Sequence, residues 1–368
     1  MKQDIILIGA GIIGLATAER FLEQGARISI LERNKIGQES SWAGGGILSP
    51  LCPWNYSEEV TRLTSYSATL FPAWTKTLHK TTGIDSEYVT CGMLVLPPYA
   101  AQDAHYWCSK HNIKIEEPLL SDISTTGINI DNIRQQGLFL PDIAQVRNPR
   151  LIQALHDRVI QLGGEIFEDC AVTDITVKHK QVQSLTSMRG KFRADHYIVT
   201  SGAWSKEVLG QYAINLDIKP MRGQMLLLKF SAPPIHTILV KKDLYIIPRQ
   251  DGHLLIGSTL EDVGFDKRTT DIACNDLLTR ALAILPSLHT MPVVKQWAGL
   301  RPASPDNIPT IGRHPVIQNL HVNSGHFRYG VTMAPASAEI LFNELTGKPQ
   351  PFDTTPYQAG WNVKSRFG

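Results

Sequence analysis

Apolar positions follow two periods along the chain and predict alternating strands and helices. The apolar run at 4–8 is typical of a buried parallel strand, and positions 12–23 repeat at helical spacing until Gly25 ends the pattern. Ser57 and Asp271 are expected to cap later helices. Helical spacing returns over 57–78, 103–110, 148–162, 271–285 and 331–345. Short apolar or alternating stretches predict strands at 28–31, 92–96, 165–167, 172–177, 182–186, 191–193, 197–200, 225–230, 239–240, 244–247, 254–256, 293–300 and 320–323.

The order of these elements predicts an α/β fold with an α+β insert. Buried runs followed by glycine turns lie near both ends of the chain, as in a Rossmann-type parallel sheet. Strands in the middle are separated by short turns, as in an antiparallel sheet. At 368 residues the chain is long enough for two domains. We expect a discontinuous cofactor-binding domain from 1–85, 145–215 and 300–368, and a mainly antiparallel β-sheet substrate domain from 86–144 and 216–299.

The first strand and helix enclose a glycine turn that is typical of dinucleotide binding. Gly9, Gly11 and Gly14 have G-x-G-x-x-G spacing, and Glu32 follows the next strand. Gly9 permits the tight turn, Gly11 lets the backbone approach a pyrophosphate, and Gly14 lets the helix lie close to the strand. The helix N-terminus offers N–H groups to the phosphates, and Glu32 can accept hydrogen bonds from a ribose. The turn alone leaves open which dinucleotide is bound.

Composition narrows the class of protein. The net charge of +2 comes with scattered basic residues, which argues against nucleic acid as a partner. The five cysteines are far apart and the twelve histidines lack ligand spacing, so we expect reduced thiols, a cytoplasmic location and no metal. No apolar run approaches the roughly 18 residues of a spanning helix. A secretory signal is the alternative for the N-terminus, but Asp4 and three glycines interrupt that pattern.

Three further glycine-rich strand ends favour FAD over a nicotinamide cofactor. They lie at Gly44–Gly46, at Gly202 and at Gly325–Gly330. FAD is buried along its length and needs several places where the backbone approaches closely, which glycine permits. The helix that begins near 330–332 could aim its N–H groups at the N1–C2=O edge of the flavin. They would stabilise the anion formed there on reduction.

Several motifs resemble the FAD-dependent amine oxidoreductases of the D-amino-acid oxidase family. They are Gly9–Gly14, Glu32–Arg33, Glu39–Ile47, Trp297–Pro302 and Gly325–Gly330, and the resemblance extends from residue 4 to about 346. Within the family they are most similar to the glycine-oxidising members of thiamine biosynthesis. The resemblance implies hydride transfer from the substrate Cα to flavin N5 and reoxidation by O2, which gives hydrogen peroxide. It implies non-covalent FAD, because no cysteine lies within 300–305.

The glycine turns and the resemblance together predict the residues of the site. Arg301 is expected to grip a substrate carboxylate, Tyr245 to share that carboxylate, and Arg328 to contact substrate near the flavin. Arg249 is expected to be structural and His326 to be a hydrogen-bonded loop residue. No general base is expected, because hydride transfer needs none. The predicted FAD-binding residues are Gly9, Gly11, Ile12, Ile13, Gly14, Glu32, Arg33, Ser40, Ser41, Ala43, Gly44, Gly45, Gly46, Val172, Gly202, His326, Phe327, Tyr329, Gly330, Val331 and Thr332.

The resemblance implies oxidative deamination of glycine to an imine that would supply the thiazole part of thiamine. Sarcosine and small D-amino acids are further candidate substrates, and Ile47 and Tyr329 stand where glycine-oxidising members can carry Met and Asn. One alternative is a D-amino-acid or glycine dehydrogenase with an acceptor other than O2. Another is a non-catalytic flavoprotein or an electron-transfer subunit. The expected partners are a small amino acid and O2. The sequence leaves the oligomeric state open, and family members are often homo-oligomers.

Overall fold

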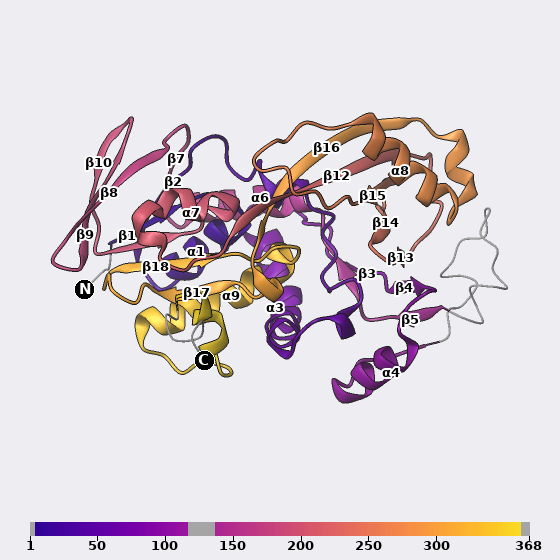
Figure 1. Cartoon of the computed structure of the whole chain (residues 1–368), viewed down its shortest axis with the longest axis horizontal. Helices are drawn as coiled ribbons and strands as arrows, with labels where there is room; N and C mark the ends of the chain where they lie inside the picture. Colours follow the sequence, from indigo (N-terminus) through magenta and orange to yellow (C-terminus); the bar gives the residue numbers. More distant parts are fainter. Residues whose placement is uncertain (1–3, 117–136, 362–368) are drawn as a thin grey trace.

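Two large sheets organise the chain and lie toward opposite ends of its long axis (Figure 1). The structure is a computed structural model that describes residues 4–116 and 137–361. The first sheet has the order β17-β18-β11-β1-β2-β7 and is parallel except for the β17–β18 pair. Its strands are β1 (Asp4–Ile8), β2 (Arg27–Leu31), β7 (Glu165–Phe167), β11 (His196–Val199), β17 (Thr310–Arg313) and β18 (Leu320–Ser324).

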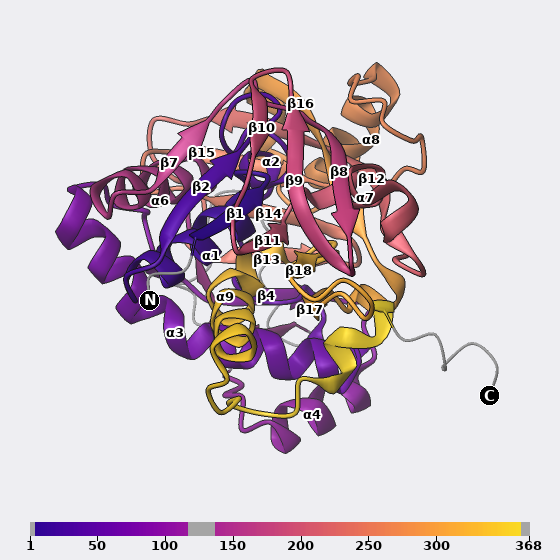
Figure 2. The ribbon, with the colours of Figure 1, turned by 90° about the vertical axis from the view of Figure 1, so that its left-hand side faces the viewer.

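Both faces of this first sheet are covered, which explains why β1 is apolar at nearly every position. Ile5 and Leu7 join a core formed with the helices on one face, whereas Ile6 and Ile8 join a core on the other face. Figure 2 shows α1, α3 and α9 gathered on one side of the sheet. The helices of that side are α1 (Ile12–Leu22), α3 (Glu58–Thr82), α6 (Asn148–Gln161) and α9 (Gly330–Thr346).

A small three-stranded sheet and a short helix cover the opposite face. The order of this sheet is β10-β9-β8, and Ile175, Val182 and Leu185 extend the core that Ile6 and Ile8 begin. The elements are β8 (Val172–Lys178), β9 (Gln181–Ser187), β10 (Gly190–Phe192) and α7 (Ser205–Leu209).

The second large sheet has seven strands in the order β16-β12-β15-β14-β13-β4-β5. All neighbours are antiparallel except β13 and β4. Leu226, Leu228 and Ile256 on one face pack against Leu277 of α8, while Met225, Tyr245 and other residues form a separate core on the opposite face. The elements are β4 (Met93–Leu96), β5 (Leu138–Leu140), β12 (Lys219–Lys229), β13 (Ile238–Lys241), β14 (Leu244–Pro248), β15 (His253–Gly257), β16 (Val293–Ala303), α4 (Ala101–Lys110) and α8 (Asp271–Leu282).

Short elements link the two halves of the molecule. The strands β3 (Val89–Thr90) and β6 (Ala144–Gln145) pair in an antiparallel manner, and α2 (Ser40–Ala43) follows the long loop after β2. The remaining 3-10 turns are η1 (Pro53–Asn55), η2 (Gly202–Trp204), η3 (Gly210–Ala213), η4 (Pro286–Thr290), η5 (Pro305–Asn307) and η6 (Thr355–Trp361).

The predicted fold class is confirmed, and the differences concern element ends and short elements that were not predicted, such as β5 and β17. Thr270, not Asp271, caps α8, because its side-chain oxygen accepts a hydrogen bond from the Ala273 N–H. Ser57 stands at the N-cap of α3, but its side chain makes no capping hydrogen bond. The predicted domain division stays a proposal, and β16 runs across its boundary at 300. Among the described residues, no helix is long and apolar enough to cross a membrane.

Candidate active site and cofactor cavity

A long cavity lies at the carboxyl ends of β1, β2 and β11 and reaches the seven-stranded sheet. The same cavity is lined by Glu32 and Arg33 at the end of β2 and by Tyr245, Arg301 and Arg328 from distant parts of the chain. Open parallel sheets bind ligands at this edge, where loops after neighbouring strands diverge. The cavity therefore joins the predicted dinucleotide turn to the predicted substrate residues.

The glycine turn after β1 has no room for side chains at two of its positions. A Cβ at Gly9, whose φ is +114°, would lie 2.7 Å from the Thr200 carbonyl oxygen, and one at Gly14 would lie 2.0 Å from the Gly9 carbonyl oxygen. Helix α1 is thereby held against the strand. The Ile12 N–H donates to Ser41 Oγ at 2.9 Å, so the loop of α2 closes over the helix N-terminus.

Glu32 and Arg33 are fixed at one end of the cavity. The two carboxylate oxygens of Glu32 accept hydrogen bonds from the backbone N–H groups of Ala10 at 2.8 Å and Asn34 at 3.0 Å. A carboxylate has about four acceptor positions, so capacity remains for ribose hydroxyls. The guanidinium of Arg33 lies 3.5 Å from the centroid of the Trp204 ring, a cation–π contact that places a flat surface beside Glu32.

Arg249 holds the glycine loop at the middle of the cavity. Its buried guanidinium donates to the carbonyl oxygens of Gly45 at 2.7 Å and Val146 at 2.9 Å and to Gln145 Oε1 at 2.6 Å. These bonds fix the backbone of Gly45 and Gly46 where it lines the cavity. The side chain thus has the structural role predicted for it.

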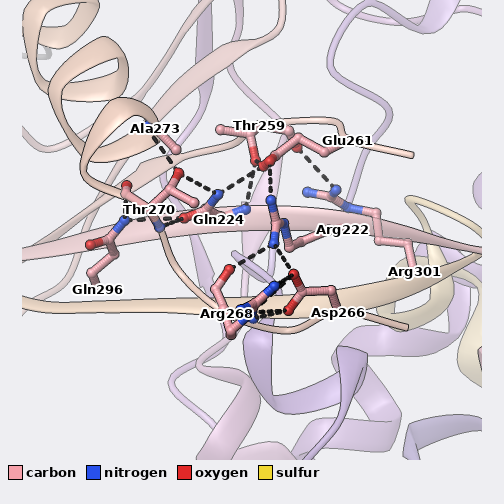
Figure 3. A network of polar contacts seen from close by, with 10 residues as sticks. All are labelled: Arg222, Gln224, Thr259, Glu261, Asp266, Arg268, Thr270, Ala273, Gln296 and Arg301. Atoms are coloured by element: carbon pink, nitrogen blue, oxygen red, sulfur yellow. Dashed lines mark hydrogen bonds and ion pairs between the residues drawn. The ribbon is translucent and has the colours of Figure 1, made fainter. Parts of the chain in front are cut away.

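Arg301 reaches the cavity by crossing a glycine. It extends from β16 over the neighbouring strand β12, where a Cβ at Gly223 would lie only 2.1 Å from Arg301 Nη1. Beyond that strand, Nη2 donates to Ser258 Oγ at 2.6 Å and Nη1 to the Thr259 carbonyl oxygen at 3.2 Å (Figure 3 shows the contact with Thr259). Burial lowers the pKa of Arg301, but its guanidinium stays charged at neutral pH. Its remaining N–H groups can bind a carboxylate.

Tyr245 and Arg328 complete this end of the cavity. The ring of Tyr245 lies on Gly257, where a Cβ would come within 2.7 Å of its hydroxyl, and that hydroxyl donates to Met225 Sδ at 3.7 Å. The guanidinium of Arg328 has no hydrogen-bond or ion-pair partner among the described residues, although it lies 5.3 Å from the Phe327 ring centroid. Arg301 and Arg328 therefore make this end strongly cationic.

Two buried residues of the segment after β18 are uncharged. Burial lowers the pKa of His326 to about 3, and its Nε2 is paired with Ser337 Oγ at 2.9 Å. Burial also raises the pKa of the Tyr329 hydroxyl well above its ordinary value, and the ring lies edge-on to Tyr56 at 5.1 Å. A neutral imidazole already paired with a hydroxyl is a poor candidate for a general base.

The lining residues fit FAD. The side-chain oxygens Oδ1 of Asn148 and Asn323 are buried without a hydrogen-bond partner, and both residues line the cavity. Both side chains therefore have acceptor capacity left over beside the cavity. A Cβ at Gly202 would meet no atom within 4 Å, so the space beside it is open. The first turns of α1 and α9 present N–H groups at two separate points of the cavity.

Most predicted site residues meet in this one cavity. Gly14 and Ala43 do not line it, because Gly14 packs on Gly9 and Ala43 packs on Gly299. The other nineteen predicted FAD-binding residues line the cavity, as do all three predicted substrate residues. Sequence reasoning missed Asn148, Trp204 and Ser258. Of these three, Ser258 could have been found from the sequence, because it directly follows Gly257 at the end of a strand.

A smaller pocket adjoins the substrate end. It shares Leu51 and Arg328 with the long cavity and is also lined by Trp54, Tyr99 and Lys242. Arg328 therefore stands between the two spaces. Within the described part of the chain, no group of three or more His, Cys, Asp or Glu side chains could hold a metal ion.

Comparisons with known proteins agree with a cavity that binds FAD. A family model described as FAD dependent oxidoreductase matches residues 4–343. The glycine oxidase of Pseudomonas aeruginosa is 38% identical over 97% of this chain and 98% of that protein. The bifunctional protein ThiO/ThiG of Trichormus variabilis is 32% identical over 93% of this chain and 52% of its own length. The crystal structure of glycine oxidase from Geobacillus kaustophilus has a TM-score of 0.89 at 25% identity, over 97% of this chain and 98% of that chain.

Proposed function

Because the chain belongs to the family of FAD-dependent oxidoreductases, we propose that it is a glycine oxidase of the ThiO type. The reaction is the oxidation of glycine to its imine, with sarcosine and small D-amino acids as further substrates. The observation that carries the proposal is the Arg301 guanidinium, held toward the same cavity that the dinucleotide turn enters.

The residues of the chain bind and orient the substrate. Arg301 pairs with the substrate carboxylate, and the Tyr245 hydroxyl, which lies over Gly257, adds a further hydrogen bond to it. Arg328, which also lines the cavity, adds positive charge to the same space. When bound, FAD supplies the two-electron acceptor for the hydride that leaves the substrate Cα. Positioning of that Cα supplies most of the catalysis, and no side chain acts as a general base.

The N-terminus of α9 would favour negative charge on a cofactor bound in this cavity. Gly330, Val331 and Thr332 line the cavity, and the Thr332 hydroxyl donates to the Ile47 carbonyl oxygen at 3.0 Å. That bond ties the first turn of α9 to the glycine loop. The partial positive charge of the turn is thereby kept at the cavity wall, where it would stabilise negative charge on bound FAD.

Oxygen is the proposed electron acceptor, and the dehydrogenase alternative is not favoured. The named relatives in Pseudomonas aeruginosa and Geobacillus kaustophilus are oxidases, which supports this choice. The likeness to the ThiO/ThiG protein supports a role in supplying the imine for the thiazole of thiamine. We also propose a cytoplasmic location, because all five cysteines are free. A homo-oligomer is proposed as well, and light scattering tests it.

Anaerobic reduction of the flavin tests the proposed activity. Glycine, sarcosine and D-alanine should each bleach the flavin absorbance, and air should restore it with release of peroxide. Arg301→Ala should weaken glycine binding far more than it lowers FAD content. Failure of every small amino acid to bleach the flavin would favour a non-catalytic flavoprotein, whereas turnover only with an artificial acceptor would favour a dehydrogenase.

A further inference from the structure

Thr259 connects the substrate end of the cavity with the opposite face of the seven-stranded sheet. Its carbonyl oxygen accepts the hydrogen bond from Arg301 Nη1. Its side-chain hydroxyl accepts from the backbone N–H of Gln224 at 2.9 Å and donates to the carboxylate of Glu261. Thr259 therefore contacts Arg301, which we call the carboxylate clamp, through its backbone. It contacts Glu261 through its side chain.

The strand register places Arg301 on one face of the seven-stranded sheet and the polar residues behind it on the other face. On β12, Met221 pairs with Arg301 and Gly223 pairs with Gly299, so these positions share the cavity face. Arg222 and Gln224 alternate with them and point to the other face, where α8 packs. The polar side chains behind the clamp are thus separated from the substrate by the sheet itself.

Glu261 is the centre of this polar network (Figure 3). Its carboxylate accepts from Arg222 Nη2 at 2.5 Å, from Gln224 Nε2 at 2.9 Å and from the Thr259 hydroxyl. Its backbone exchanges two hydrogen bonds of 2.9 Å with the backbone of Arg222. Partial burial disfavours the charged carboxylate, but the three hydrogen bonds outweigh that cost and keep the pKa of Glu261 below its ordinary value. The carboxylate is therefore a fixed anion at neutral pH.

The network extends toward helix α8 and fixes the strands around it. The Gln224 side-chain oxygen accepts from the Thr270 N–H at 2.8 Å and from Gln296 Nε2 at 3.1 Å. Thr270 is the residue that caps α8. The segment that follows β15 is thereby tied to β12, β16 and the start of α8, and its backbone has little freedom to move.

We infer that Glu261, acting through Thr259, is a positioning residue for the Arg301 carboxylate clamp. It touches neither substrate nor cofactor. It holds the 258–261 segment, and that segment supplies both hydrogen-bond acceptors that orient the guanidinium, Ser258 Oγ and the Thr259 carbonyl oxygen. The inference rests on the proposed function only in requiring that the ligand of Arg301 is a carboxylate.

Three variants of the FAD-loaded enzyme test the inference. Glu261→Gln removes the charge, Thr259→Val removes the hydroxyl, and Thr259→Ser keeps it. Acetate, which has a carboxylate and no amine, is the probe, and calorimetry measures its dissociation constant. Glu261→Gln and Thr259→Val should each raise the acetate dissociation constant and the glycine KM roughly tenfold, since a well-aligned charged hydrogen bond is weakened. The kcat should stay within about twofold. Thr259→Ser should bind acetate as the unaltered protein does.

The matched control is Asp262→Asn. Asp262 follows Glu261 directly, but its side chain is 60% exposed and pairs with the exposed Lys219 at 2.8 Å. This variant should leave the acetate dissociation constant unchanged. If Glu261→Gln loses its FAD on purification, the Thr259→Val and Thr259→Ser pair decides alone. Unchanged acetate binding in Thr259→Val with full FAD content overturns the inference. If the unaltered protein binds acetate but glycine does not reduce its flavin, the proposed function is refuted and the inference stands on acetate binding in the variants.

Discussion

Gly223→Ala should damage the substrate clamp and leave the fold intact. The added Cβ would lie 2.1 Å from Arg301 Nη1 and 2.3 Å from both Cζ and Nη2. Ordinary contact begins near 3.5 Å, so the guanidinium must move by roughly 1 Å. Every atom in this clash belongs to the far end of one flexible side chain. The cost therefore falls on the orientation of Arg301 and not on the sheet.

The expected magnitude follows from the two bonds that orient the guanidinium. A shift of about 1 Å away from β12 carries the 3.2 Å bond to the Thr259 carbonyl oxygen beyond hydrogen-bond distance and misaligns the bond to Ser258. Displacements of this size cost on the order of 100-fold, or about 2.7 kcal/mol of transition-state stabilisation. We expect kcat/KM for glycine to fall by roughly that factor. FAD content and melting temperature should stay near those of the unaltered protein.

A double-mutant cycle separates this mechanism from general disruption. Peroxide release gives kcat/KM for Gly223→Ala, Arg301→Met and the double variant. If the new Cβ acts only through the guanidinium, it costs nothing further once Arg301 is Met. Additive losses would refute the reasoning, because the methyl group would then harm the site by a route that does not involve Arg301. Equal activity of Gly223→Ala and the unaltered protein would refute it as well.

Three further changes test other parts of the structure. Gly14→Ala places a Cβ 2.0 Å from the Gly9 carbonyl oxygen, and since backbone cannot yield cheaply, the purified protein should contain little FAD by its flavin absorbance. Arg249→Met leaves the Gly45 carbonyl and two other buried acceptors unpaired, so thermal unfolding should show a loss of about 3 kcal/mol or more together with weaker FAD binding. Glu19 has its pKa raised by burial from 4.5 to about 7, so the folded state takes up a proton that the unfolded state lacks between these pH values. Stability should fall by at most about 3 kcal/mol as pH rises through that window, and Glu19→Gln should abolish the fall in chemical unfolding curves.

Each of these three expectations has an outcome that contradicts it. Full FAD content in Gly14→Ala would mean that helix α1 tolerates a shift away from β1. Unchanged stability of Arg249→Met would mean that water replaces the guanidinium. For Glu19, the Trp74 indole N–H donates to its carboxylate at 2.6 Å, and a glutamine retains an acceptor there. Parallel pH profiles for the unaltered protein and Glu19→Gln would show that another group causes the pH dependence.

Local signals predicted the dinucleotide half of the site. The spacing of Gly9, Gly11 and Gly14 depends on contacts within one strand, one turn and one helix, and these contacts are set by nearby residues. The end of α9 was marked in the same way, because Gly347 takes the left-handed conformation with a φ of +67° at its C-cap. Where the fold follows from short-range geometry, the sequence locates the element.

The support of Arg301 could not be predicted in the same way. Its contact with Gly223 depends on the register between β12 and β16, and its bonds to Ser258 and Thr259 depend on where β15 ends. Register is fixed by the packing of whole faces, not by a local motif. The edge strand β17 was missed for a related reason, because its four residues gain strand structure only by pairing with β18.

The strand glycines nevertheless contain information about the site. Gly223 and Gly299 stand opposite each other on β12 and β16, and Gly257 stands opposite Tyr245. Glycine weakens a strand, so its presence inside three neighbouring strands requires a reason. In each case the missing Cβ is replaced by another group: the Arg301 guanidinium, the Ala43 methyl group or the Tyr245 ring. The opposite face keeps Leu226, Leu228 and Ile256 packed against α8 and holds the sheet together. On the cavity face, the glycines therefore leave the space that the Arg301 and Tyr245 side chains occupy. On the opposite face, packing and polar contacts stabilise the same strands.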